Sequence, residues 1–417
     1  MIQKRKTLIS EDWAASLLGF FIIAIVVSRV ASFAPVYNWK SLTELFGFFS
    51  IANIGRIVLQ GLLASFVVCF ACWLTGKSIV PSLKVFSLLF VLSQLALLTS
   101  ANGWVKSYSL EAVIFSLLFG LTVNYMFHIP QSWREALNTE LFVKIGLVLL
   151  GTSVIFSDIL RTGSLGLIQS LIVVISVWYV AFWVAKKLKV DEELGLMLAS
   201  AVSICGVSAA IATAGAIKGN TKKLSHVISL VLVTAIPMMI FMPVIAKQLG
   251  LSEEVTGAWL GGSIDTTGAV VASGSLVGEV ALKTSTIVKF SQNVLLGFAA
   301  LAISIYWTYT KKGDVAIQQE KPTLGVIWER FPKFVLGFLA ASLLFSFFLS
   351  AETIGSVKDS LKSIQTLWFV LAFTSIGLET KFSDLFNSDS QKPLYAFLIA
   401  QFFNILVTLV IAYFLFR

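Results

Sequence analysis

Long runs of apolar residues are the feature that most limits what this chain can fold into. Runs such as residues 13–30, 80–100 and 394–416 carry few charges and are separated by short polar segments. A helix that rises 1.5 Å per residue needs about 20 residues to cross the hydrocarbon core of a bilayer. Lipid offers the backbone no hydrogen-bond partner, so such runs are typical of spanning helices. The chain is therefore expected to be an all-α polytopic membrane protein.

Composition leaves little room for a soluble domain. Of the 417 residues, 57% are hydrophobic and 13% are charged, whereas roughly a quarter are charged in an average soluble domain. The longest hydrophilic stretch, residues 311–333, is interpreted as a loop. The net charge of +9 comes from Lys and Arg between the apolar runs, which indicates the positive-inside bias of a bacterial cytoplasmic (inner) membrane protein rather than a nucleic-acid partner.

Common catalytic signatures are absent from the sequence. It contains no HExxH and no GxSxG, and Cys69 and Cys72 lack a second Cys/His pair. The end of a Walker A motif at Gly76-Lys77-Ser78 lacks the first glycine of that motif, because Ala71 stands there. The chain is therefore not expected to be an enzyme, and it is expected to need no cofactor beyond a coupling ion such as H⁺ or Na⁺.

The apolar runs give a set of candidate spans and two interrupted segments. The interrupted segments lie near residues 194–217 and 256–277, where small and polar residues break an apolar pattern. Re-entrant hairpins are favoured for both, because they keep the basic residues around Lys222 in the cytoplasm. Spanning helices with unwound middles are the alternative. The candidate spans are residues 13–30, 57–76, 80–100, 109–127, 142–155, 165–185, 224–246, 284–308, 334–350, 364–377 and 394–416.

Two internal similarities suggest an inverted repeat. Ser203-Ile-Cys-Gly-Val-Ser-Ala-Ala-Ile-Ala can be laid on Ser263-Ile-Asp-Thr-Thr-Gly-Ala-Val-Val-Ala, and Gly151 with residues 156–158 can be laid on Gly377 with residues 382–384. Secondary transporters often place their site at the midplane between such repeats. The matching pieces follow a different order in the two halves, so one repeat would be circularly permuted. Chance similarity between small-residue segments is the alternative.

The two interrupted segments are the predicted substrate site. A helix that begins within the membrane offers free N–H groups and a partial positive charge, which suit an anion. Hydroxyl groups and glycines beside the breaks would complete such a site, although small residues also serve close helix packing. The predicted substrate-binding residues are Ser203, Cys205, Gly206, Ser208, Ser263, Thr266, Thr267 and Gly268.

Asp265 and Lys289 are the predicted ion-coupling residues. An ionisable side chain within an apolar segment marks a functional site by default. Asp265 would repel a bound anion unless it were protonated or neutralised by a cation, which suggests coupling to H⁺ or Na⁺. Lys289 could pair with Asp265 or meet the substrate. The plainer alternatives are a solvent-accessible cap for Asp265 and a lysine that reaches the headgroups for Lys289.

The two broken segments also carry a family resemblance. Residues 203–214 (Ser-Ile-Cys-Gly-Val-Ser-Ala-Ala-Ile-Ala-Thr-Ala) and residues 261–274 (Gly-Gly-Ser-Ile-Asp-Thr-Thr-Gly-Ala-Val-Val-Ala-Ser-Gly) look like the sulfate exporter family, also called YeiH-like. The run from Val148 to Ile159 resembles one of its core helices. The resemblance covers roughly residue 109 to the C-terminus. Many shorter members carry a His-Glu-like pair at the position of Asp265-Thr266, whereas longer members resemble this chain there. The extra helices within residues 57–100 also fit the longer subgroup.

The resemblance implies a fold and a function. It implies a distant tie to the cation/proton antiporter and bile-acid symporter superfamily, with a core domain that moves against a scaffold domain. Residues 1–107 would then be family-variable N-terminal helices, and residues 108–417 the transporter unit. The expected function is secondary active transport of a small anion, sulfate or sulfonate-like. A cation/proton antiporter and a non-transporting receptor or enzyme scaffold are the alternatives, and a homodimer is left open.

Overall fold

The computed structural model describes residues 7–29, 33–107, 112–127, 129–310, 325–380 and 391–417. Within these ranges the chain is helical and forms no strand. Eight helices are long and apolar enough to cross a membrane, and four shorter apolar helices accompany them. The predicted all-α polytopic class is confirmed.

The chain divides into two compact units, each built from two stretches of sequence. Unit 1 comprises Met1–Ser157 and Lys333–Thr380, and unit 2 comprises Asp158–Pro332 and Lys381–Arg417. The predicted division after residue 107 separates a family-variable extension from the transporter unit, which is a different division, and it stays a prediction. Long-range packing forms unit 1, because the late helix α19 (Ala351–Glu379) packs on α4 (Ile79–Ser100), α6 (Ala112–Phe127) and α8 (Thr139–Leu150).

Unit 1 is a bundle around α19. A close crossing joins α6 and α19 at Gly120 and Gly377, where an added Cβ on either glycine would meet backbone atoms of the other helix. Small residues of this kind let membrane helices approach closely. Its remaining elements are α1 (Glu11–Val27), α2 (Leu42–Phe48), α3 (Ile51–Thr75), α5 (Gly103–Ser107), α7 (Gln131–Arg134), η1 (Gly151–Ser153), α18 (Phe334–Leu343) and η3 (Leu344–Phe348).

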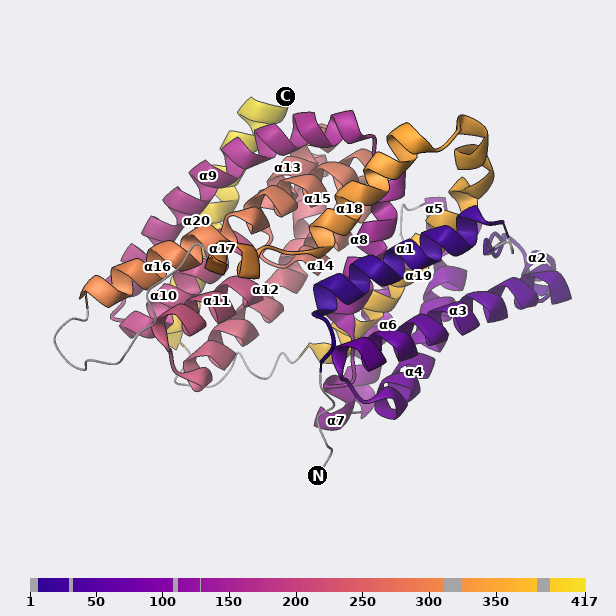
Figure 1. Cartoon of the computed structure of the whole chain (residues 1–417), viewed down its shortest axis with the longest axis horizontal. Coiled ribbons are helices and arrows are strands. Elements are labelled where there is room, and N and C mark those ends of the chain that lie inside the picture. The colour runs from indigo at the N-terminus through magenta and orange to yellow at the C-terminus, as the bar shows by residue number, and fades with distance from the viewer. Residues whose placement is uncertain (1–6, 30–32, 108–111, 128, 311–324, 381–390) are drawn as a thin grey trace. The chain divides into compact units, whose positions relative to one another are not determined.

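Unit 2 contains both interrupted segments, and Figure 1 labels its helices. The segments are framed by helices that match predicted spans. In chain order the elements are α9 (Phe156–Lys187), α10 (Glu192–Ser200), η2 (Ala201–Cys205), α11 (Val207–Ile217), α12 (Thr221–Gln248), α13 (Glu253–Ser263), α14 (Thr267–Val277), α15 (Glu279–Val294), α16 (Leu296–Thr310), α17 (Gly325–Arg330) and α20 (Gln391–Phe416).

The first interrupted segment, α10–η2–α11, turns back on itself. The Lys223 ammonium, just after α11, lies 2.6 Å from Asp191 Oδ1 and 3.2 Å from Glu193 Oε2, both at the start of α10. The Asn220 backbone N–H also donates to Glu193. The beginning and the end of the segment are therefore neighbours, and the segment is a helical hairpin, called hairpin 1 below.

The second interrupted segment, α13–α14, is also a hairpin, called hairpin 2. Glu253, the first residue of α13, accepts hydrogen bonds from the backbone N–H groups of Val280 and Ala281, just after α14. The carboxylate thereby satisfies two donors that the start of α15 would otherwise leave unpaired. The start of α13 and the end of α14 are therefore neighbours at the base of hairpin 2.

The two hairpins enter unit 2 from opposite ends. Helix α12 begins at Thr221 beside the base of hairpin 1 and ends at Gln248, close to the base of hairpin 2. Its 28 residues correspond to about 42 Å at 1.5 Å per residue. A helix of this length separates the two bases, and the tips of both hairpins point toward the middle of the unit.

Candidate functional site

The two hairpin tips meet at Gly206 and Asp265. Gly206 adopts φ 60° and ψ −110°, a conformation that side chains other than glycine rarely adopt. A Cβ placed on Gly206 would lie 2.6 Å from Val231 Cγ1 of α12, 3.1 Å from the Asp265 Cβ and 3.4 Å from the Asp265 carbonyl oxygen. Glycine is therefore required here by the backbone turn and by the closeness of both α12 and the opposite tip.

Lys289 of α15 links the two tips through their carbonyl groups. Its ammonium donates at 2.8 Å to the Ile204 carbonyl oxygen of hairpin 1 and at 2.8 Å to the Ile264 carbonyl oxygen of hairpin 2. It also donates at 2.8 Å to Gln292 Oε1. These carbonyls lie at the C-terminal end of the first helical part of each hairpin, called its entering leg below, where the helix dipole is negative. The second helix of each hairpin, α11 or α14, is called its returning leg. The buried ammonium thus stabilises two helix C-terminal ends at once.

Three amide side chains extend this arrangement. Gln292 Nε2 donates to the Ser203 and Gly262 carbonyl oxygens, and Asn404 Nδ2 of α20 donates to those of Val202 and Ser263. Gln401 Nε2 also donates to the Ser263 carbonyl oxygen. Each hairpin's entering leg therefore has its terminal carbonyls satisfied by side chains of α15 and α20.

Sequence reasoning missed Gln401 and Asn404. Both lie within the predicted span 394–416 and are buried. A signal was present, because an amide in the middle of an apolar run is costly unless it is hydrogen-bonded inside the protein.

The backbone N–H groups at the starts of the returning legs have fewer hydrogen-bond partners than the carbonyl groups at the ends of the entering legs. Helix α11 follows Gly206 directly, and no side chain caps its first turn. Helix α14 follows Thr266, whose hydroxyl accepts from the Ala269 N–H. The first N–H groups of a helix have no partner within it. The tips therefore present unused donors and the positive ends of two helix dipoles.

Several buried polar atoms around the tip of hairpin 2 have no hydrogen-bond partner. The carboxylate oxygen Oδ2 of Asp265 is one of them, and Asp265 is only 1% exposed. A buried polar group without a partner is unfavourable by itself, and in native proteins it calls for a bound water, ion or ligand. The others near this tip are Ser263 Oγ, Asn293 Oδ1 and Gln401 Oε1.

The predicted site residues are brought together only in part. Cys205, Gly206, Asp265 and Thr266 lie at or beside the meeting point of the tips. Thr267 and Gly268 occupy the first turn of α14, and the Thr267 hydroxyl accepts from Asn293 Nδ2 at 3.5 Å.

Other predicted residues have different surroundings. The Ser203 hydroxyl donates to the Ser200 carbonyl oxygen inside hairpin 1. Ser208 is exposed on the surface of unit 2. No ion pair within 4 Å joins Lys289 and Asp265, two residues that the structure describes, since the ammonium is taken up by carbonyl oxygens. Among the described residues, no group of three His, Cys, Asp or Glu side chains could hold a metal ion.

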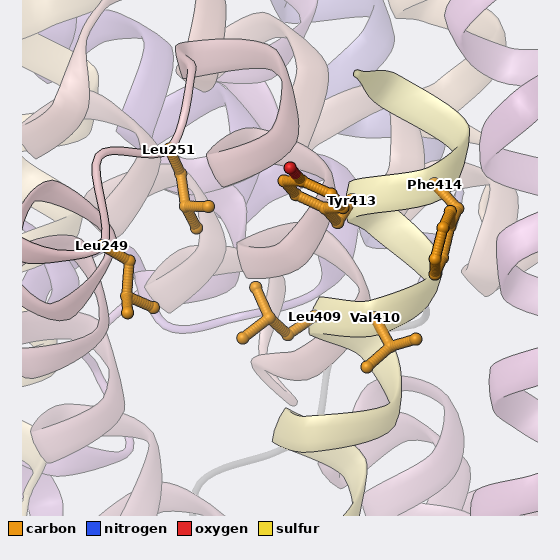
Figure 2. A pocket seen from close by; sticks show the side chains of 6 residues that line it. All are labelled: Leu249, Leu251, Leu409, Val410, Tyr413 and Phe414. Atoms are coloured by element: carbon orange, nitrogen blue, oxygen red, sulfur yellow. The ribbon is translucent and has the colours of Figure 1, made fainter.

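Unit 2 also carries an apolar groove that is separate from the tips. It has a volume of about 290 Å³ and lies where the end of α12 faces the end of α20. Figure 2 shows Leu409 and Tyr413 of α20 pointing toward Leu249 and Leu251. Val410 and Phe414 complete the lining. Apart from the Tyr413 hydroxyl, the lining side chains have no polar group, so the groove offers little of the chemistry found at the tips.

Comparison with known proteins identifies the family. The family model described as Conserved hypothetical protein 698 matches residues 84–396. The chain belongs to this family. No solved structure matches the chain.

The relatives are bacterial proteins named UPF0324 membrane proteins. The chain is similar to one from Rhodopirellula baltica, 39% identical over 374 residues that cover 86% of this chain and 68% of the relative. One from Nitratidesulfovibrio vulgaris is 37% identical and covers 78% of this chain, but only 58% of its own length is matched. One from Nitrosomonas europaea is 26% identical, with 93% of this chain and 92% of the relative covered. These names and the eight long apolar helices together support a multi-pass membrane protein. The names give no activity.

Proposed function

We propose that this chain is a secondary active transporter for a small anion, sulfate or sulfonate-like, driven by an H⁺ or Na⁺ gradient across the bacterial cytoplasmic membrane. The observation that carries the proposal is the meeting of two hairpins from opposite ends of unit 2. Non-helical backbone at membrane depth is tolerated only where it is buried in protein or lines a cavity. Paired, discontinuous helices at the midplane are typical of transport sites.

The preference for an anion rests on a difference between the two kinds of helix end at the tips. The carbonyl ends are satisfied by side chains, whereas the N–H ends are satisfied only in part. Lys289, Gln292, Gln401 and Asn404 all donate to carbonyl groups at the negative ends. The positive ends, at the starts of α11 and α14, keep unused N–H donors. An anion at the tips would accept from these donors and would lie near the Lys289 charge.

Asp265 supplies a reason for coupling. Its carboxylate is buried beside the amide ends, where it competes with a bound anion for the same positive potential. Uptake of a proton or of Na⁺ at Asp265 would remove that competition. The binding of the anion and of the coupling ion would then favour each other, as symport requires.

The charge distribution of unit 2 suggests an orientation. The end that holds the base of hairpin 1 carries more cationic than acidic residues, whereas the end at hairpin 2 is balanced. The positive-inside bias would place the base of hairpin 1 in the cytoplasm. The cationic residues of that end include Lys186, Lys187, Lys189, Lys218, Lys222 and Lys223.

A cation/proton antiporter is the second candidate, favoured by the unpaired Asp265 Oδ2. A cation site in a membrane usually gathers several acidic side chains. Among the described residues, Asp265 is the only buried acid, and the nearby Lys289 ammonium would repel a second cation. Anion transport is therefore preferred. The similarity between the two tip sequences and the sulfate exporter resemblance are compatible with it, and we infer no enzymatic role.

Transport by purified protein in liposomes tests the proposal. We expect uptake of labelled sulfate or of a small sulfonate to be stimulated by an inward H⁺ or Na⁺ gradient, and to be inhibited by an excess of the unlabelled anion. Empty liposomes and a Gly206→Trp variant, which fills the meeting point of the tips, are the controls. Exchange of Na⁺ for H⁺ without any anion movement would favour the antiporter instead.

A further inference from the structure

The oxygen atoms around the Lys289 ammonium form a compact cage. Two backbone carbonyls and the Gln292 side-chain oxygen each accept at 2.8 Å. A lysine ammonium has three donor hydrogens, so this side chain has none left for substrate. Lys289 is 1% exposed, and the cage is closed to solvent.

The cage is held in place by groups other than Lys289. The two carbonyls belong to hairpin backbones that Asn404 and Gln401 of α20 also hold. Gln292 is fixed because its Nε2 donates to the Ser203 and Gly262 carbonyl oxygens, which orients its Oε1 toward the ammonium. The three oxygens would therefore keep their positions if the ammonium were removed.

Such a set of oxygens suits a monovalent cation. Rings of carbonyl oxygens replace the hydration shell of ions in membrane proteins, and an unpaired carbonyl in this environment is costly. We propose that Lys289 is a resident cation in a monovalent-cation site, and that removing its side chain opens this site to a free ammonium-type ion or Na⁺. Lys289 is thus a positioning residue, which acts by holding the two tips rather than by touching substrate.

Thermal unfolding of the purified full-length protein in detergent tests this inference without any transport measurement. Lys289→Ala should unfold at a temperature roughly 5–10 °C below that of the natural protein in choline chloride, because two helix ends lose their counter-charge. Ammonium or methylammonium chloride should restore a large part of this loss in a saturable way, with Na⁺ less effective. The natural protein should show no difference between choline and ammonium chloride at equal ionic strength, and a response to Na⁺ that it shares with Lys289→Ala would be assigned to Asp265 instead.

Two further variants keep the inference falsifiable. Lys289→Met keeps the apolar stem without the charge, so it should be destabilised and should not respond to ammonium, because the side chain fills the cage. Lys289→Ala combined with Gln292→Leu removes one cage oxygen and should lose the ammonium response.

The inference is overturned if Lys289→Ala, recovered as a folded protein, shows no difference between choline and ammonium. It is also overturned if Lys289→Met is as stable as the natural protein, a result that can be obtained even if the alanine variant does not fold.

Discussion

The two hairpins of unit 2 are alike in outline and differ in how their ends are held. Hairpin 1 is closed at its base by exposed ion pairs of Lys223 and turns at Gly206 without a side-chain cap. Hairpin 2 is closed by the Glu253 carboxylate on backbone N–H groups and turns through Asp265 and Thr266, with Thr266 as a cap. Hairpin 1 therefore depends on backbone geometry at its tip, whereas hairpin 2 brings the ionisable side chain. Under the proposed function, both hairpins would offer N–H donors to the anion, and hairpin 2 alone would supply the coupling side chain.

Replacing Gly206 should give the largest effect on stability and tests the claim about hairpin 1. Gly206→Ala is expected to cost roughly 2–4 kcal/mol, from the unfavourable backbone conformation and from contact with Asp265 and Val231. Thermal or denaturant unfolding in detergent measures it. Gly250→Ala is a matched control, because Gly250 also has a positive φ (65°) but no atom lies within 4 Å of its added Cβ. Equal losses for the two variants would show that the tip contact contributes nothing.

Asp265→Asn tests the claim about hairpin 2. The substitution keeps the shape of the side chain and removes its charge, so we expect anion binding to persist while the stimulation by the ion gradient disappears. A coupling free energy of about 1–3 kcal/mol corresponds to a 5–150-fold effect. Uptake into liposomes with and without a gradient measures it. Undiminished gradient stimulation in this variant would refute the role of Asp265.

Asn404→Leu sharpens the comparison, since Asn404 donates to both hairpins. The Val202 carbonyl would lose this donor, while the Ser263 carbonyl would retain Gln401. We expect a loss of about 1–3 kcal/mol in the free energy of unfolding. Phe402→Leu on the same helix, at a side chain that is 64% exposed, serves as the control and should be nearly neutral. A loss no larger than that of the control would mean that the amide bonds do not stabilise the tips.

Lys223→Met at the base of hairpin 1 should have the smallest effect. Its side chain and that of Asp191 are 31% and 51% exposed, so the loss should stay below about 1 kcal/mol. Partial burial pushes the pKa of the Asp191 carboxyl upward, but hydrogen bonds from Lys223 and the Leu194 backbone lower it overall.

The sign of the pH dependence follows from that lowered pKa. The ion pair contributes fully above the unfolded pKa of Asp191, about 4, and its contribution is lost as the pH falls through the folded value. The stability difference between Lys223→Met and the natural protein should therefore shrink below about pH 4. Lys222→Met, which removes a neighbouring lysine that forms no ion pair among the described residues, should show no such trend. A difference that stays constant in acid would argue against the ion pair.

Hydropathy predicted most spanning helices because apolar runs of this length have one stable form in lipid. Hydropathy placed the start of α19 too late, near residue 364, whereas the helix begins at Ala351. Charged residues such as Lys358 and Asp359 lower the hydropathy of its first turns. The division into two units could not be predicted, since it depends on packing between α19 and helices more than 200 residues earlier in the chain.

The candidate site was visible in the sequence only where residue type implied a backbone break. Gly206 and Asp265 stood out as a glycine and a charge inside apolar segments. The contacts of Lys289 with two carbonyls, and those of Gln401 and Asn404, required knowledge of which helices face the tips. The substrate and coupling roles of these residues remain predictions.

The sharing of one ammonium by both hairpins limits how the two tips can move. Lifting either tip away from Lys289 leaves its charge with two of its three oxygen partners, and lifting both leaves it with Gln292 alone. An ammonium that stays buried with a single oxygen partner is strongly destabilised. The shared bonds therefore oppose any arrangement in which both tips leave Lys289 at once.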